Sequence, residues 1–528
     1  MSHRPSSSKP KSFALTLIFL TLTLLLLTLT FRSNPSRTDI PHLQNEPSRD
    51  TFNVPKRYPR WYKVVAREIK GNNMKLGFVN MDERVERIEE LPGAVQMVRV
   101  QFDRVEKEQK WENLFPEWID QEERFGPQTC PHIPMPRFEE YRGLDVVVAR
   151  VPCAEGRPKG EGVRDVFRLQ VNLVVANLLV RNGSWKNHGV DRTVYVVFIG
   201  QCGPMLEIFR CDDLLWHGGE YWVYRPDLRR LHQKVVMPVG SCQLAPPFAK
   251  TGKQMWGIYW GSAQKNPYQP SEAYVTILHS SETYVCGAIA LAQSIIQTNS
   301  TKELVLLADD SISTKSLQGL KAAGWKIKHI ERIRSPQAEK DAYNRWNYSK
   351  LRIWQLIEYD KLLFIDADLI ALKNMDKFFQ YPELSAAGND KSLFNSGVML
   401  VEPSRCMFKI LMRKRFTLAS YNGGDQGFLN EVFTWWHRWS SKVNHLKVFE
   451  SPDNPKHEIP EDLYTIHYLG VKPWMCGKEY DCNWDVALHH PFASNSAYRK
   501  WWQVYEAMPN NLRPYCALGR PKSSAKSR

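Results

Sequence analysis

Lys361-Leu362-Leu363-Phe364-Ile365-Asp366-Ala367-Asp368 places four consecutive apolar residues between charged ones. Such a run is typical of a strand that is buried in the middle of a parallel sheet. Two carboxylates follow where the strand is predicted to end, and ligands of open α/β sheets bind at the carboxyl ends of strands. Aspartates one residue apart can share a divalent cation, which in turn can hold a diphosphate. An Asp-x-Asp alone is more often a capped turn or a solvated loop, so this prediction depends on other motifs.

The segments before this stretch alternate between strand and helix patterns. Strands are predicted at Ala273–His279 and Glu303–Ala308, a helix at Tyr284–Ile296, and a second helix from Asp309-Asp310 to Ala323. A third helix is predicted at Lys350–Glu358, with Leu351, Trp354 and Ile357 on its inner face. This alternation predicts an α/β domain with a parallel sheet of the nucleotide-binding type.

Three later stretches carry polar groups suited to a bound nucleotide. Leu393–Leu400 places Asn395 and Ser396 before another predicted buried strand. Asn422–Gly427 is a glycine-rich turn with one acid and one amide, and glycines let the backbone approach a ligand closely. His467–Trp474 offers an imidazole and, five residues later, an ammonium group, and Lys350 could add another cation. Each stretch alone has an ordinary structural explanation, but this combination in this order is hard to obtain by chance.

Together these motifs resemble glycosyltransferase family eight, the glycogenin-like retaining enzymes, over about residues 270–490. Upstream, Trp118–Asp120, Asp145–Cys153, Phe167–Leu178 and Val194–Gly203 resemble the plant branch that transfers glucuronic acid to xylan. The resemblance implies a GT-A type, Rossmann-like catalytic domain with a mixed, mostly parallel sheet. An α/β accessory domain and an N-terminal transmembrane helix would precede it.

The resemblance also implies the site residues. Asp366, Asp368 and His467 would bind Mn²⁺, since an imidazole beside two carboxylates favours Mn²⁺ over Mg²⁺. Asp425, Gln426 and Lys472 would be the catalytic residues, with Lys472 a point charge on the diphosphate and Asp425 the candidate nucleophile if retention is covalent. A front-face displacement needs no nucleophile, and both routes stay open. Tyr284 and the turn Leu278–Ser280 would approach the uracil. The donor would be lined by Asp366, Ala367, Asp368, Asn395, Ser396, Gly397, Asn422, Gly423, Gly424, Asp425, Gln426, His467, Tyr468, Leu469, Gly470, Val471, Lys472 and Lys350.

Residues 12–31 run for 20 residues without a charge, which is enough for a helix to cross a bilayer core of about 30 Å. The run is longer than the apolar part of a typical signal peptide, so a single-pass anchor is predicted, with residues 1–11 cytoplasmic and 32–57 a stem. The plant branch is Golgi-resident, which agrees with a type II membrane protein whose catalytic domain is luminal. Complexes with other Golgi enzymes of wall synthesis are a further expectation.

The accessory domain is predicted at residues 58–250, and 491–528 forms a C-terminal extension. The strands of the accessory domain are expected at Trp61–Ile69, Ala94–Phe102, Leu144–Val151 and Thr193–Ile199, and a helix is expected at Val166–Val180. A segment from Pro246 to Gly261 is predicted to join the two domains.

The remaining bulk features bound the function. The net charge of +15 is spread along the chain without a dense basic run, so nucleic acid is not a predicted partner. The ten cysteines contain no Cys-x-x-Cys, so a zinc site is unsupported, and Cys476 with Cys482 is a plausible disulfide loop. Sequons at Asn182, Asn299 and Asn347 are compatible with a luminal domain.

The leading prediction is a transferase that takes UDP-glucuronate as donor and xylan as acceptor in plant cell-wall synthesis. Alternatives are a family member that uses UDP-glucose, UDP-galactose or UDP-galacturonate, or a non-catalytic carbohydrate-binding scaffold. Glucuronate differs from glucose by a carboxylate, so a cation is expected near it, and Arg345 is the candidate.

Overall fold

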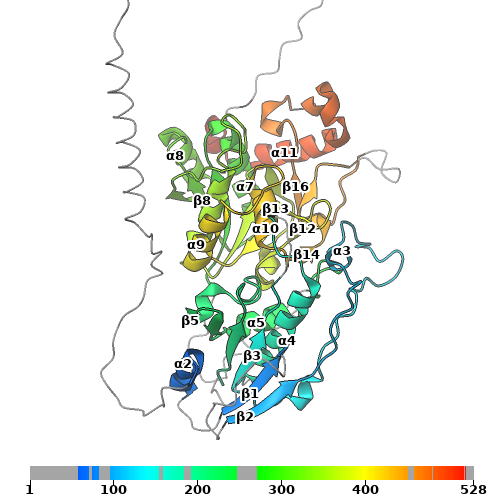
Figure 1. The fold of residues 1–528 in the computed structure, drawn as a ribbon. Helices are drawn as coiled ribbons and strands as arrows, with labels where there is room; N and C mark the ends of the chain where they lie inside the picture. Colours follow the sequence, from blue (N-terminus) through cyan, green and yellow to red (C-terminus); the bar gives the residue numbers. More distant parts are fainter. Residues whose placement is uncertain are drawn as a thin grey trace, which may run out of the picture. The chain divides into compact units, whose positions relative to one another are not determined.

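The computed structural model is built around two large β-sheets and one small sheet (Figure 1). It describes residues 58–69, 74–81, 95–153, 159–183, 192–246, 270–449, 457–478, 480–516 and 518. The predicted tail, membrane anchor and stem lie outside these residues, as do most of the predicted linker and the end of the chain. Among the helices of the described residues, none has both the length and the apolar character needed to cross a membrane.

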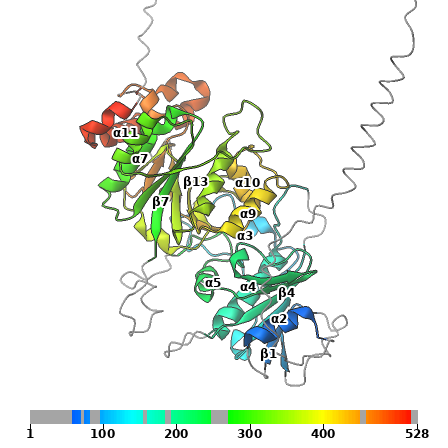
Figure 2. The same ribbon diagram turned by 90° about the vertical axis from the view of Figure 1, so that its left-hand side faces the viewer.

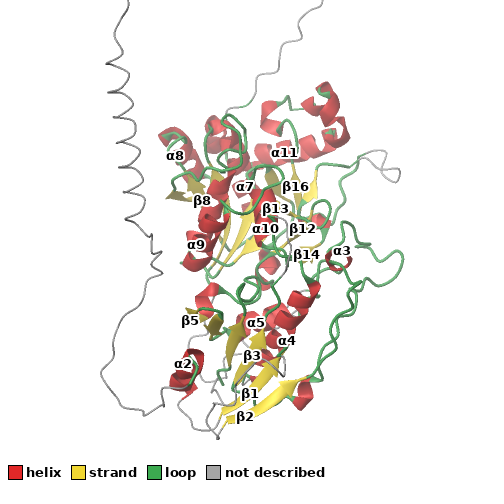
Figure 3. Ribbon diagram, in the orientation of Figure 1, coloured by secondary structure: helices red, strands yellow, loops and turns green. Residues whose placement is uncertain are grey.

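The first sheet has the strand order β2-β1-β3-β4-β6-β5. Its strands are β1 (Met74–Val79), β2 (Val95–Val100), β3 (Val146–Arg150), β4 (Tyr195–Ile199), β5 (Leu214–Gly218) and β6 (Tyr221–Tyr224). The first four strands run parallel, and β6 and β5 are antiparallel additions. Helix α4 (Val166–Asn182) packs on one face, and α3 (Trp111–Leu114) and α5 (Leu228–Val235) complete this region (Figure 3). The last three strands predicted from sequence and the helix at 166 are confirmed.

The strand predicted at Trp61–Ile69 is wrong, because this segment forms helix α2 (Arg60–Ile69). Its aromatic and β-branched residues favour a strand by composition. The buried residues, however, are Trp61, Tyr62 and Val65, whose spacing matches one face of a helix and not alternate positions of a strand. This face packs against the side of the first sheet opposite to α4.

The second sheet has the strand order β14-β12-β13-β10-β7-β8-β9. Its strands are β7 (Glu272–Leu278), β8 (Glu303–Ala308), β9 (Lys326–His329), β10 (Lys361–Ile365), β12 (Ser385–Gly388), β13 (Phe394–Val401) and β14 (His437–Trp439). β10, β7, β8 and β9 are parallel, while β13 is antiparallel to both of its neighbours. The predicted α/β fold with a mixed, mostly parallel sheet is confirmed, and every residue of β10 is buried as expected.

Helices cover both faces of this second sheet (Figures 1 and 2). The core on one face contains α7 (Val285–Gln297), α8 (Thr314–Ala322) and α11 (Asn495–Ala507). The core on the other face contains α9 (Arg405–Lys414) and α10 (Asp425–Val432). A small third sheet, in the order β11-β16-β15, is formed by Leu369–Ala371, Thr465–His467 and His445–Leu446.

The helix predicted at Lys350–Glu358 is a 3₁₀ helix, η5, at Asn347–Gln355. Tyr348, Leu351 and Trp354 are all fully buried, and their spacing of three residues matches the three residues per turn of a 3₁₀ helix. Ile357 was expected on the same inner face, but it lies beyond the helix and is 44% exposed. The strand predicted after Asn395 and Ser396 also begins earlier than expected, so that both residues lie within β13.

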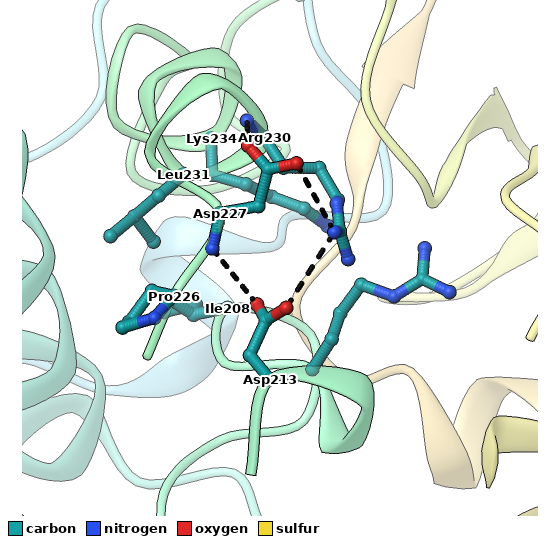
Figure 4. Close-up of a pocket in the computed structure, with 8 residues that line it drawn as sticks. Ile208, Asp213, Pro226, Asp227, Arg230, Leu231 and Lys234 are labelled. Carbon is teal, nitrogen blue, oxygen red and sulfur yellow. Dashed lines mark hydrogen bonds and ion pairs between the residues drawn. The ribbon is translucent and has the colours of Figure 1, made fainter. Parts of the chain in front are cut away.

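One hydrophobic core continues from α4 and the first sheet to β7, β10 and α10 of the second, within a compact unit of residues 57–528. A buried ion pair and a disulfide bond also join the two regions. Arg210 Nη1 lies 2.8 Å from Glu402 Oε2, and Cys211 is disulfide-bonded to Cys406. Close by, a cavity of about 10 Å³ is lined by Asp213, Asp227 and Arg230 (Figure 4). That volume suits a single water molecule, and the cavity contains none of the predicted site residues.

All ten cysteines are paired, and the predicted loop between Cys476 and Cys482 is confirmed. The other bonds join Cys130 to Cys242, Cys153 to Cys202 and Cys286 to Cys516. The structure also bears on the sequon at Asn182. This residue is buried in α4, and its amide binds the carbonyls of Tyr141 and Leu178, so no glycan can attach to it in the folded protein.

Candidate active site

Strand pairing brings the three predicted metal ligands together from segments about 100 residues apart. Asp366 and Asp368 lie in the turn between β10 and β11, at the carboxyl end of β10. β11 pairs antiparallel with β16, and this register sets Leu369 opposite His467. The backbone N–H of Tyr468 also donates to the carbonyl of Asp368 at 3.0 Å. The small third sheet therefore places the imidazole beside the Asp-x-Asp turn.

The side chains of Asp366, Asp368 and His467 fit a divalent cation. One ligand atom from each lies within 4.8 Å of the others, and His467 Nε2 is 3.4 Å from Asp368 Oδ1. Lysines flank both carboxylates: Lys472 Nζ is 2.7 Å from Asp368 Oδ2, and Lys350 Nζ is 3.3 Å from Asp366 Oδ1. Lys350 also lies 2.6 Å from Asp425, so three carboxylates face two ammonium groups. The surplus negative charge suits a bound cation.

The ionisation of the two aspartates differs because their neighbours differ. Burial, reinforced by the Asp368 carboxylate, raises the pKa of Asp366 to about 6, although Lys350 opposes the shift. Burial alone would also raise the pKa of Asp368, but Lys472 and His467 outweigh it and hold that pKa well below its usual value. Two neighbouring carboxylates repel each other when both are ionised, and a divalent ion bound between them removes this repulsion.

β13 and α10 form a second wall of the site. The backbone N–H of Asp366 donates to the carbonyl of Gly397 at 2.9 Å, which sets the Asn395–Gly397 segment beside the Asp-x-Asp turn. Ser396 connects to α10 twice: its N–H donates to Gln426 Oε1 at 3.1 Å and its hydroxyl to Asp425 Oδ2 at 2.9 Å. The structure thus brings Lys350, Ser396 and both residues of the predicted Asp-Gln pair into one connected group.

Sequence reasoning missed Asn444, which orients His467. Asn444 Oδ1 lies 3.1 Å from His467 Nδ1, and its Nδ2 donates to Asn395 Oδ1 at 2.9 Å. This contact assigns the proton to Nδ1, so Nε2 keeps its lone pair toward Asp368, as a metal-binding imidazole requires. Asn444 is an isolated amide in an ordinary stretch, and only the pairing of β15 with β16 reveals its position.

Two glycines permit close approach at the site. A Cβ at Gly397 would lie 2.7 Å from His467 Cε1, so a larger residue there would displace the imidazole. A Cβ on Gly287 in α7 would lie 2.4 Å from the carbonyl oxygen of Ala367, in the middle of the Asp-x-Asp turn. Gly287 was not predicted as a site residue, because a glycine inside a helix pattern gives no such signal.

The stretch after His467 contributes mainly backbone and the Lys472 ammonium. Lys472 Nζ donates to the carbonyl of Tyr468 at 2.6 Å as well as to Asp368. The Tyr468 side chain points into the core, where its hydroxyl donates to Ala497. Gly470 has a φ of +68°, which reverses the chain so that Lys472 returns to the site. Tyr284, predicted near the uracil, has its ring 5.7 Å from Lys472 Nζ.

The glycine-rich turn lies directly before α10, and a loop before η5 packs on it. Asn422 Oδ1 accepts from the N–H of Gly424 at 2.9 Å, and the Asn344 amide donates to the Asn422 carbonyl. Arg345 follows Asn344, and its guanidinium lies 4.9 Å from the centre of the Trp346 ring. Arg345 forms no ion pair with any residue that the structure describes, and its Nε is buried without a hydrogen-bond partner.

Comparison with known proteins covers both sheets. Residues 51–242 match the family described as GUX1-5 N-terminal domain, and residues 275–476 match Glycosyl transferase family 8. UDP-glucuronate:xylan alpha-glucuronosyltransferase 2 of Arabidopsis thaliana is 48% identical over 463 residues, which cover 85% of this chain and 76% of that protein. Inositol phosphorylceramide glucuronosyltransferase 1 of the same plant is 41% identical over 245 residues, covering 45% and 44%. Human glycogenin-2 is 28% identical over 263 residues, covering 46% and 51%.

Proposed function

Because the chain belongs to the UDP-glucuronate:xylan alpha-glucuronosyltransferases of glycosyltransferase family 8, we propose that it transfers glucuronic acid from UDP-glucuronate to xylan. The transfer retains the anomeric configuration. The observation that carries this proposal is the gathering of Asp366, Asp368 and His467 with Lys350 and Lys472 at the carboxyl end of β10. A binding scaffold would not need this costly cluster of buried charge.

We propose Mn²⁺ as the cation that Asp366, Asp368 and His467 bind, because an imidazole beside two carboxylates favours it over Mg²⁺. When bound, such an ion neutralises the diphosphate oxygens and stabilises their growing charge.

Two lysines of the protein also stabilise the negative charge that develops on the diphosphate. Breaking the bond between the sugar and the diphosphate leaves extra negative charge on UDP, and a fixed cation at that place stabilises the transition state. Lys472 is such a cation: burial alone would lower its pKa, but Asp368 outweighs it and raises the pKa, so the ammonium stays protonated. Asp366 and Asp425 do the same for Lys350, and the pair with Asp425 holds Lys350 in position.

A donor screen tests the function. The full-length protein is incubated with xylohexaose, Mn²⁺ and either UDP-glucuronate, UDP-glucose, UDP-galactose or UDP-galacturonate, and products are identified by mass spectrometry and NMR. We expect kcat/KM for UDP-glucuronate to exceed that for each other donor by at least about tenfold, as one charge-assisted contact allows. The product should be α-linked. A preference for another donor, or a β-linked product, would reject the proposal.

We also propose that residues 12–31 anchor the protein in the Golgi membrane with its catalytic part in the lumen. The uncharged run of 20 residues and the five disulfide bonds support this, since disulfides persist in oxidising compartments. The full-length chain should resist carbonate extraction from membranes, and release by carbonate would contradict the anchor. Complexes with other Golgi enzymes of wall synthesis stay a prediction.

A further inference from the structure

Two tyrosines beside the candidate active site expose their rings to solvent. Tyr421 lies in the connection between α9 and α10 and is 57% exposed, and Tyr343 lies in the loop before η5 and is 89% exposed. Tyr343 directly precedes Asn344 and Tyr421 directly precedes Asn422, and these two asparagines are hydrogen-bonded to each other. The two exposed rings therefore come from segments that are hydrogen-bonded to each other at the edge of the site. Figure 2 shows α9 and α10, which border this connection.

Tyr421 is linked to a predicted catalytic residue. Gln426 Nε2 donates to the Tyr421 hydroxyl at 2.6 Å, and Gln426 Oε1 accepts from the N–H of Ser396 at 3.1 Å. Ser396 in turn contacts Asp425 and Lys350, which lies beside the metal ligand Asp366. Three hydrogen bonds thus connect the Tyr421 hydroxyl to Lys350, by way of Gln426 and Ser396.

The loops that carry both rings are fixed to each other. Ser335 Oγ donates to the carbonyl of Gly423 at 2.7 Å, and Gln337 binds the backbone of Leu418 and Ser420. A ligand that binds such a prearranged surface loses little additional entropy, because the loops are already ordered. Rings exposed on a fixed surface cost solvation free energy, which a stacked ligand would recover.

The chemistry of the rings points to a neutral sugar. The faces of a pyranose ring carry C–H groups that pack on an aromatic ring, while its edge hydroxyls reach polar groups such as the Tyr421 and Gln426 side chains. Xylan is an uncharged chain of such rings, so it needs stacking surfaces and hydrogen bonds more than ion pairs. We propose that Tyr343 and Tyr421 form a stacking platform that binds the xylan acceptor and sets a xylose hydroxyl beside Gln426. This inference rests on the proposed function and deepens it.

The test measures acceptor and donor binding separately, with the full-length protein, xylohexaose and UDP-glucuronate. Tyr343→Ala and Tyr421→Ala should each raise the acceptor KM about three- to tenfold, the range for loss of one aromatic stacking contact. The KM for UDP-glucuronate should change by less than twofold. Tyr343→Phe, which keeps the ring, should restore the acceptor KM. Tyr421→Phe should also restore it but lower kcat, because Gln426 loses the hydroxyl that positions it.

Phe416→Ala is the matched control. Phe416 lies in the same connection and is 67% exposed, but within the described residues it has no hydrogen bond or ring contact to a predicted site residue. An acceptor KM that rises as much in Phe416→Ala as in Tyr421→Ala would assign the effect to the loop and overturn the platform. Equal rises of donor and acceptor KM in the tyrosine variants would overturn it as well.

Saturation-transfer NMR of xylohexaose separates this proposal from the proposed function. If the wild type binds xylohexaose but transfers no glucuronic acid, and Tyr343→Ala and Tyr421→Ala lose this binding, the platform is kept and the function is rejected. Normal transfer to xylohexaose with unchanged acceptor KM in both alanine variants would keep the function and reject the platform.

Discussion

Replacing Asn444 by alanine should weaken Mn²⁺ binding although it removes no metal ligand. Asn444 Oδ1 lies 3.1 Å from His467 Nδ1 and thereby keeps the Nε2 lone pair directed at the site. Loss of such a partner typically costs about 10–100-fold in metal affinity, which corresponds to about 1.4–2.8 kcal/mol. The assay is a titration of the full-length protein with Mn²⁺ alone, in which free Mn²⁺ is read by electron paramagnetic resonance.

The same substitution also affects folding, and a second variant separates the two effects. Asn444 Nδ2 donates to Asn395 Oδ1 at 2.9 Å, so its loss should lower the free energy of unfolding by about 1 kcal/mol. Asn444→Asp keeps an acceptor opposite His467 Nδ1 but cannot donate to Asn395. It should lose stability yet bind Mn²⁺ about as tightly as the wild type. Mn²⁺ affinity within twofold of wild type in Asn444→Ala would refute the reasoning, as would Asn444→Asp binding Mn²⁺ as weakly as alanine.

Three further outcomes are expected from other parts of the site and fold. Asp368→Ala should abolish transfer and also lower the melting temperature, because it leaves Lys472 without its ion-pair partner. In the wild type EDTA should stop transfer until Mn²⁺ is restored, and full activity in metal-free buffer would contradict the metal role. Glu402→Gln should lower the free energy of unfolding at pH 7 by about 3 kcal/mol, because it removes the carboxylate that pairs with buried Lys361 and one of the three that surround buried Arg210. Burial opposes ionisation of Glu402, but Lys361 and Arg210 lower its pKa to about 2, so its stabilisation is complete above its ordinary pKa near 4.5 and is lost as the pH falls toward 2. The difference between wild type and Glu402→Gln in denaturant unfolding should therefore shrink below about pH 4.5, and a constant difference would exclude this ionic role. Arg345→Ala should reduce kcat/KM for UDP-glucuronate about tenfold more than for UDP-glucose, and equal losses would show that Arg345 does not bind the carboxylate.

Residues whose role is local could be predicted from the chain alone. A buried apolar run that ends in Asp366 and Asp368 marks a strand end at a ligand-binding edge, and β10 lies there. The same holds for β7 and β8, which are continuous buried apolar runs, and for α7 and α4, which are long helices that are buried on most sides. Periodicity failed where composition and spacing disagreed, as in α2, whose strand-forming residues are buried at helical intervals. It also failed in η5, where a spacing of three residues gives a 3₁₀ helix.

The arrangement of the site depends on pairing between distant segments, which no local pattern encodes. His467 reaches Asp368 because β16 pairs with β11 in one particular register. Asn444 reaches His467 because β15 joins the same sheet, and Tyr421 reaches Gln426 because the chain folds back before α10. Residue types and strand ends follow from local hydrophobicity, so the sequence determined which groups the protein carries to the sheet edge. Which of them touch follows from strand register and loop packing over long range, and these only the tertiary structure decided.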